Sequence, residues 1–146
     1  MDLRAEEERR EADGWAVFEG LLSRVPEDRL TAPGVLEGWS VKEMLNHVTG
    51  WLEVCIARLE AMRSGRFVDE DETDEEVNER NAYFAESARR LDATTVREHL
   101  ETARARLLEL WRSLPEIDEV AIEQFATETY EHYEEHVPDL ELAAAD

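Results

Sequence analysis

The sequence predicts an all-α fold, an antiparallel four-helix bundle with a long connection between its second and third helices. Apolar residues recur every three or four positions in four long segments, which is the period of an amphipathic helix. No segment shows the two-residue alternation that is typical of a half-buried strand. The chain has 146 residues, of which 42% are hydrophobic, and this is enough to bury one continuous core without disulfide bonds. We therefore expect residues 1–146 to form a single domain.

The first helix is predicted over residues 3–24. Its polar beginning gives way to an apolar stripe that includes Trp15, Phe18 and Leu22. The helix should end before Pro26, because the residue that precedes a proline is pushed out of the helical conformation. Residues 26–39 contain two prolines and two glycines, which predicts a structured connection without a regular element.

The second helix is predicted to begin after Ser40. The Ser40 hydroxyl can accept a hydrogen bond from a first-turn amide, and Glu43, three residues later, can reach back to the Ser40 amide. Apolar residues then recur at helical spacing as far as Met62.

The long connection after this helix is dominated by an acidic run over residues 69–79. A calcium loop needs a glycine at its sharp turn and a different ligand spacing, and the run has neither. We predict a solvated loop and the start of a short helix that continues through Tyr83, Phe84 and Ala88.

The third helix is predicted to begin with a capping box formed by Thr95 and Glu98 and to end at Pro115. The fourth helix should begin at about Val120, and its apolar side continues to Val137. Pro138 should kink or end this helix, because its ring clashes with the carbonyl four residues earlier.

Two histidines in the fourth helix are the strongest indication of function. His132 and His136 are four residues apart, so their imidazoles project from one face of a helix and have the spacing needed to share a divalent metal ion. His47, in the second helix, is the candidate third ligand, and such a site would leave coordination positions open for water or substrate. His99 has no such partner and is expected to be a surface residue.

The site should lie in a cleft between the second and fourth helices. His132 and His136 project onto one flank of the apolar stripe, beside Thr129, and Trp51 follows His47 by one helical turn. Glu43 and Glu128, each four residues before a histidine, are candidate carboxylate partners for the outer ring nitrogens.

The charge of the chain excludes some partners. Lysine and arginine total 16 against 37 aspartates and glutamates, and the formal net charge of -21 repels nucleic acid and anionic membrane surfaces. No apolar run approaches the roughly 18 residues that span a bilayer. Cys55 is the only cysteine, so no internal disulfide can form, and its place on an apolar helix face predicts a buried, inert thiol. The beginning of the sequence lacks the pattern of a secretion signal, and we expect a cytoplasmic location.

Two motifs resemble those of a known family. The Gly-Trp-Ser segment that leads to His47 is similar to the opening of the second helix in the DinB-like (YfiT-like) superfamily, and His132 to His136 is similar to the motif that carries two further histidines there. The resemblance implies a four-helix bundle with a three-histidine metal site at His47, His132 and His136. Val77, Asn78 and the pattern of the third helix look like the branch near the colibactin self-resistance proteins.

The resemblance also implies a class of reaction. Relatives in this superfamily include bacillithiol and mycothiol transferases and a thiol-dependent maleylpyruvate isomerase, which use a metal to activate a low-molecular-weight thiol toward a small electrophile. We therefore expect a metal-dependent enzyme of thiol S-transferase or hydrolase type that acts on a small electrophilic or toxic molecule. The resemblance leaves the general base unassigned, and the candidates for the pocket wall are Trp51, Asn78 and Thr129.

The expected cofactor is a divalent metal ion, with zinc, nickel or iron as the leading candidates, because three imidazoles suit each of them. A low-molecular-weight thiol is the expected cosubstrate, and a homodimer is implied by the resemblance. Two alternatives stay open. The first is a non-catalytic protein that binds a small molecule or holds a metal as a staple between helices. The second is a purely structural bundle in which the histidines are incidental.

Overall fold

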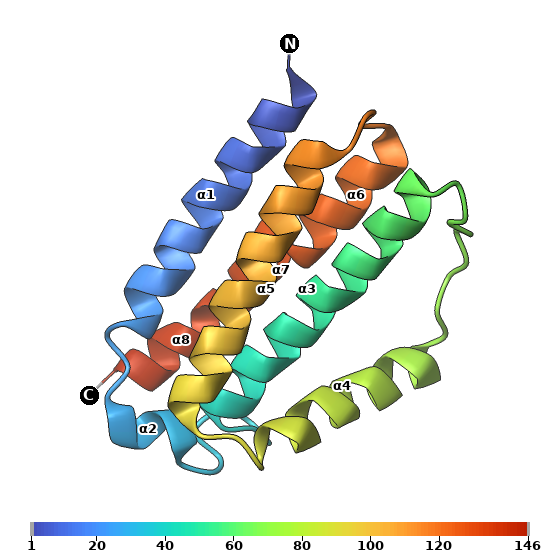
Figure 1. Ribbon diagram of the computed structural model, residues 1–146. Coiled ribbons are helices and arrows are strands. Elements are labelled where there is room, and N and C mark those ends of the chain that lie inside the picture. Colours follow the sequence, from blue (N-terminus) through green and yellow to red (C-terminus); the bar gives the residue numbers. More distant parts are fainter. Residues whose placement is uncertain (1, 146) are drawn as a thin grey trace.

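The computed structural model describes residues 2–145, and all regular elements among them are helices, apart from one isolated β-bridge between Leu36 and Trp39. The helices pack side by side as a bundle (Figure 1), which confirms the predicted fold class. The bundle has four helical positions. Three of them hold one long helix each: α1 (Leu3–Leu22), α3 (Val41–Arg63) and α5 (Ala93–Ser113). The fourth holds three consecutive helices: α6 (Glu119–Glu128), α7 (Tyr130–Glu135) and α8 (Val137–Ala144). None of the described helices is long and apolar enough to cross a membrane.

Helix α3 is the central element, because it packs against α4, α5 and α6. It begins with the predicted capping box: the Ser40 hydroxyl accepts from the Glu43 amide, and the Glu43 side chain accepts from the Ser40 amide. Just before it, Gly38 has a φ of 83°, a conformation that residues other than glycine rarely adopt. This turn precedes Trp39, whose ring lies 4.9 Å from the ring of His47, centroid to centroid.

Helix α5 begins earlier than predicted. Its N-cap is Asp92, whose Oδ1 accepts from the Thr95 amide at 2.7 Å, so the predicted capping box of Thr95 with Glu98 is wrong. The carboxylate of Asp92 satisfies the same kind of first-turn amide that a threonine hydroxyl would, and Thr95 therefore lies inside the helix.

The fourth position of the bundle was predicted to hold one helix as far as Pro138. In the structure this helix is broken twice. At Thr129 the backbone leaves the helical conformation (φ -110°, ψ -103°), and the Thr129 hydroxyl donates to the Phe125 carbonyl at 2.7 Å, a contact that bends helices. The second break, at His136, agrees with the prediction from Pro138, which lies in the first turn of α8.

The long connection between α3 and α5 contains α4 (Asp74–Ala88), on the outside of the bundle against α3 (Figure 1). Thr73 and Glu76 form a capping box at its beginning, in the predicted solvated acidic run. The connection between α1 and α3 contains α2 (Glu27–Thr31), a short helix that the pattern did not predict.

The core is a single cluster to which the long helices contribute, and it includes Phe18, Leu52, Trp111 and Phe125. Cys55 is buried on α3, as predicted, with its Sγ 3.6 Å from the Gln124 carbonyl oxygen. Burial raises the pKa of the Cys55 thiol far above its ordinary value, so the thiol is protonated and inert.

Helix α7 is fixed to α1 by a buried polar network. Glu11, on α1, is 1% exposed and receives two hydrogen bonds from Arg104, at 2.7 and 2.8 Å, and one from the Tyr133 hydroxyl at 2.9 Å. Because Tyr133 adjoins His132 in the chain, this network holds in place the helix that carries two of the candidate ligands.

Candidate metal centre

The three predicted histidines converge on one point. The Nε2 atom of His132, on α7, lies 3.0 Å from Nε2 of His47, on α3, and 3.1 Å from Nε2 of His136, at the junction of α7 and α8. Their ligand atoms all lie within 4.8 Å of one another, and the three side chains are buried. Three nitrogens bound to one tetrahedral zinc ion at about 2.05 Å would be about 3.3 Å apart, so this arrangement fits a shared metal ion.

Hydrogen bonds among the rings do not account for the arrangement. A neutral imidazole nitrogen is either a donor or an acceptor, so Nε2 of His132 can satisfy only one of its two neighbours. The other contact would have to share the same hydrogen or lone pair, or bring like groups together. A cation between the three nitrogens removes this conflict.

The hydrogen-bond partners of the outer ring nitrogens, the Nδ1 atoms, differ from the prediction. Nδ1 of His136 lies 2.8 Å from Oδ2 of Asp139, three residues later on α8, and a carboxylate in this position fixes the ring with its Nε2 lone pair toward the centre. Glu43 serves the cap of α3 and Glu128 contacts Arg58, so neither is the predicted partner of a histidine. Nδ1 of His47 and Nδ1 of His132 are buried without a hydrogen-bond partner.

Burial keeps two of the imidazoles neutral. Burial and, to a lesser extent, the neighbouring His136 lower the pKa of His47 to about 4, although the Asn81 side chain opposes the shift. Burial and the two neighbouring rings lower the pKa of His132 to about 3. At neutral pH both rings therefore present lone pairs, the form that binds a metal.

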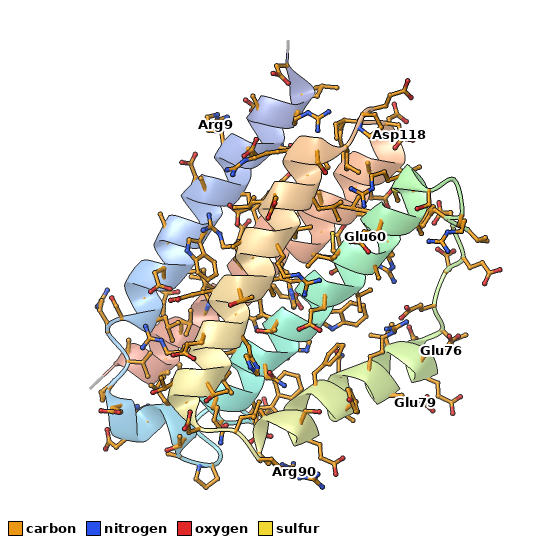
Figure 2. All side chains as sticks on the ribbon, viewed as in Figure 1. Arg9, Glu60, Glu76, Glu79, Arg90 and Asp118 are labelled. Carbon is orange, nitrogen blue, oxygen red and sulfur yellow. The ribbon has the colours of Figure 1, made fainter. Side chains whose placement is uncertain are left out.

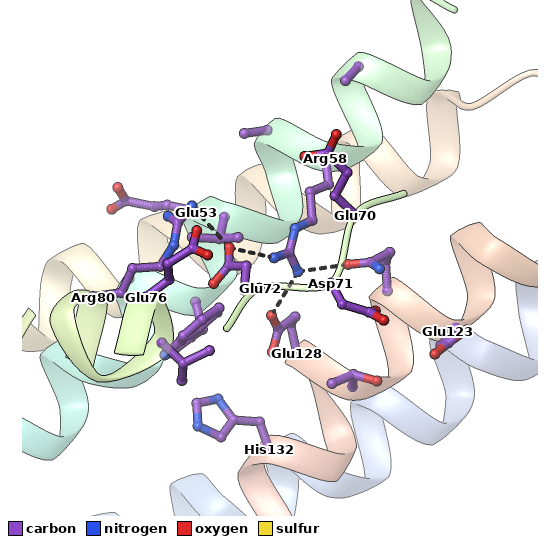
Figure 3. Close-up of a pocket in the computed structure, with 18 of the residues that line it drawn as sticks. Glu53, Arg58, Glu70, Asp71, Glu72, Glu76, Arg80, Glu123, Glu128 and His132 are labelled. Carbon is purple, nitrogen blue, oxygen red and sulfur yellow. Dashed lines mark hydrogen bonds and ion pairs between the residues drawn. The ribbon is translucent and has the colours of Figure 1, made fainter. Parts of the chain in front are cut away.

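A cavity of about 1160 Å³ opens beside the cluster, and His47 and His132 form part of its wall. Figure 3 shows His132 at this wall. The predicted cleft between the second and fourth helices is widened by two further segments, because the irregular residues 66–72 and helix α4 also line it. The cavity is therefore bounded by α3, α4, α6, α7 and the acidic connection.

Of the three residues predicted for the pocket wall, the structure places only Trp51 there. Asn78 lies on the exposed face of α4, and Thr129 is fully buried at the helix break with its hydroxyl bonded to the Phe125 carbonyl. The wall residue of α4 is instead Asn81, whose Oδ1 accepts from Trp51 Nε1 at 2.7 Å. Asn81 is three residues beyond Asn78, so the correct helix was predicted but not the correct residue.

Charged side chains meet in the cavity from three helices and from the acidic connection between α3 and α4 (Figure 3). Arg58, on α3, donates to Glu72 of the acidic connection at 3.0 Å and lies 3.5 Å from Glu128 of α6. Arg80, on α4, contacts the same Glu72 oxygen at 3.0 Å. Burial raises the pKa of Glu128 to about 7, although the Arg58 guanidinium opposes the shift. Of these residues the sequence pattern indicated only Glu128, and in another role, as a candidate partner of a histidine; Arg58, Glu72 and Arg80 are each one charged residue among many.

Comparisons with known proteins agree with the fold. A family model described as the mycothiol maleylpyruvate isomerase N-terminal domain matches residues 12–123. The chain resembles the crystal structure of the mycothiol-dependent maleylpyruvate isomerase, with 21% identity and a TM-score of 0.73. It resembles equally the structure of that enzyme with one histidine replaced by alanine, with 20% identity and a TM-score of 0.73. Both alignments cover 94% of this chain but 60% of the other, so this chain spans less than two thirds of that enzyme. No curated protein matches the chain.

Proposed function

The chain belongs to the mycothiol maleylpyruvate isomerase N-terminal domain family, within the DinB-like (YfiT-like) superfamily, and from this premise we propose that it is a metal-dependent enzyme that uses a low-molecular-weight thiol. The proposed reaction is of thiol S-transferase or hydrolase type, on a small electrophilic or toxic molecule. The observation that carries the proposal is the convergence of three buried imidazole nitrogens at the wall of a cavity large enough for a small molecule.

His47, His132 and His136 would hold the metal, with zinc, nickel or iron as the candidates. Such an ion supplies a Lewis acid that lowers the pKa of a thiol or of water, so that a nucleophile is available at neutral pH. The protein residues provide the setting: Asp139 orients His136, and Trp51, with Asn81 bonded to it, forms the wall against which a substrate would lie.

The thiol is the part of the proposal that the family supports. The matched family and the similar crystal structure both name mycothiol. The resemblance of Val77 and Asn78 to the colibactin self-resistance branch remains a prediction, as do the single domain, the cytoplasmic location and a homodimer.

A second candidate function is a metal staple without catalysis. The three nitrogens belong to α3 and to the α7–α8 junction, so one ion would tie separate helices of the bundle together. The same geometry therefore favours a structural role as well, and the experiment must separate the two.

The first test is the metal content of purified protein, measured for the wild type and for His47→Ala, His132→Ala and His136→Ala. His99→Ala is the matched control, because His99 is an exposed histidine on α5. The wild type and the control should hold about one metal ion per chain, and each of the other variants much less. Equal metal content in all five proteins would refute the site.

The second test is thiol consumption with a panel of small electrophiles, in the presence and absence of a chelator. Metal-dependent consumption that is lost in His132→Ala supports the enzyme. A strong fall in melting temperature on chelation, without thiol consumption for any electrophile, favours the staple.

A further inference from the structure

The carboxylate of Glu72 lies between two guanidinium groups at the cavity wall. Its Oε1 atom is 3.0 Å from Nη2 of Arg58, on α3, and 3.0 Å from Nη2 of Arg80, on α4 (Figure 3). The two arginines belong to different helices, and both line the cavity that His47 and His132 also line. A carboxylate therefore already occupies a position suited to an anionic group of a ligand.

The two arginines have contacts that do not depend on Glu72. Nη1 of Arg58 donates to Gln124 Oε1 at 2.9 Å and lies 3.5 Å from Glu128 Oε2, so α6 holds the Arg58 guanidinium in place. The Arg80 guanidinium lies 6.0 Å from the centroid of the Trp51 ring, at the edge of the cation–π range. The subsite would persist if Glu72 moved away.

Glu72 is held in place less firmly than the two arginines. Its Oε2 atom is buried without a hydrogen-bond partner, and an unsatisfied carboxylate oxygen destabilises the closed arrangement. The residue belongs to the irregular segment between α3 and α4, in which residues 69–71 are exposed. Little packing therefore opposes its displacement.

We propose that Arg58 and Arg80 form a carboxylate-binding subsite of the cavity and that Glu72 is an internal occupant, which the carboxylate of a small-molecule ligand displaces. The inference rests on the proposed function in that it assigns a chemical class, a small carboxylate, to the molecule that the cavity receives. With Glu72 displaced, two guanidinium groups face the single buried carboxyl of Glu128, and the local charge favours an anion. The other acidic residues of the wall, such as Glu53 and Glu135, are exposed and screened by solvent.

The subsite lies within reach of the three histidines. Arg58 contacts Glu128, the last residue of α6, and His132 follows four residues later on α7, beyond the break at Thr129; Arg58, Glu128 and His132 all line the cavity. A ligand that places a carboxylate at the arginines therefore has its reactive atom a few carbons away at the cluster.

The test is the affinity for glutarate, a five-carbon dicarboxylate, measured by titration calorimetry on zinc-loaded and on chelator-treated protein. Glu72→Ala removes the internal competitor, and its dissociation constant for glutarate should fall roughly threefold to tenfold below that of the wild type. Arg80→Ala should weaken binding by a similar factor, and because the Arg80 side chain is half-exposed, the circular dichroism spectrum of this variant should match that of the wild type. Neutral glutaramide should bind equally to all variants.

Glu70→Ala is the matched control. Glu70 lies in the same segment and lines the same cavity but is exposed, so this variant loses the same charge without emptying the subsite. Equal effects of Glu72→Ala and Glu70→Ala, or no glutarate binding to either the wild type or Glu72→Ala, would overturn the subsite. Binding that is lost in the chelator-treated protein would also overturn it, because the carboxylate would then be bound to the metal. If Glu72→Ala binds glutarate more tightly than the wild type, but the protein neither holds metal nor consumes thiol, the subsite stands and the proposed function fails.

Discussion

At the residue scale, Asp139 is the side chain that orients His136. Its Oδ2 lies 2.8 Å from Nδ1 of the ring, which leaves Nε2 to face the cluster. Asp139→Ala should lower the affinity for zinc by about 10-fold to 100-fold, since a carboxylate behind a ligand histidine contributes to this extent. Competition with a chromogenic chelator measures the effect. Glu141→Ala, an exposed position on the same helix, is the control, and an equal effect there would contradict the assignment.

Glu128 gives a prediction for the pH dependence of stability. Burial raises its pKa from 4.5 to about 7 in the folded protein, so between these values the folded chain keeps a proton that the unfolded chain has lost. The free energy of unfolding therefore contains a contribution that is present below pH 4.5 and is lost as the pH rises toward 7. Glu128→Gln stays neutral throughout, so it should exceed the wild type in stability by about 2–3 kcal/mol at pH 8.

Denaturant unfolding of both chelator-treated proteins from pH 4.5 to pH 8 measures this difference. The Glu128→Gln variant and the wild type should have similar free energies of unfolding at the acidic end, and the two should diverge as the pH rises. A difference that is constant over this range would show that the Glu128 carboxyl is not perturbed in the fold.

The candidate site could be predicted only in part from the sequence. His132 and His136 are separated by one helical turn, so local spacing brings them together, and the pattern in the second helix adds His47. Asp139 is three residues after His136, but it is one of 37 acidic residues and lies beyond the break at His136, so the sequence did not single it out. Arg58 and Glu72 meet across the cavity from separate elements, a juxtaposition that no periodicity encodes.

At the element scale, the contact between α3 and α4 depends on a glycine. The Phe84 ring of α4 lies directly over Gly50 of α3, and a Cβ atom built at Gly50 would be 2.4 Å from that ring. The Asn46 side chain adds a hydrogen bond to the Phe84 carbonyl at 2.6 Å. Gly50→Ala should therefore displace α4, which carries Asn81 and Arg80, and lower the free energy of unfolding by about 1–3 kcal/mol.

Gly20→Ala is the control for this prediction. Gly20 is also a helical glycine, but nothing lies within 4 Å of a Cβ atom built there, so alanine should stabilise α1 by up to about 1 kcal/mol. Adding Phe84→Ala to Gly50→Ala should relieve the overlap. The double variant should therefore lose less free energy of unfolding than the sum of the losses of the two single variants. Equal effects of the two glycine substitutions, measured by thermal unfolding, would contradict the close contact.

The helices that the sequence predicts well are those whose ends carry local signals. The capping box at Ser40 and the prolines at positions 26 and 138 each act through a steric or hydrogen-bond rule that is visible in the sequence. The break at Thr129 has no such signal, because a threonine inside a helix bonds back to the carbonyl four residues earlier in many helices that stay intact. The course of α4 against α3 depends on the packing of Phe84, which is a tertiary contact.

At the scale of the whole molecule, the negative charge dominates. Glu76, Glu79 and Asp118 are among the many acidic side chains on the outside of the bundle (Figure 2), and the formal net charge is -21. Repulsion among them destabilises the compact state, and salt screens it. Raising sodium chloride from about 0.02 M to about 0.5 M should therefore raise the melting temperature by about 5 °C at pH 7.5.

The same addition of salt at a pH near the isoelectric point is the control, because the net charge is then small and the melting temperature should change much less. A fall in melting temperature with salt at pH 7.5 would mean that the ion pairs, such as that of Arg104 with Glu11, outweigh the repulsion.

The buried position of Cys55 has a practical consequence for the chemistry proposed here. The only sulfhydryl of the chain is sealed against α6, out of reach of alkylating reagents. The native protein can therefore meet iodoacetamide or an epoxide without being inactivated at its own cysteine. Carbamidomethylation of Cys55, read by mass spectrometry, would report opening of the core.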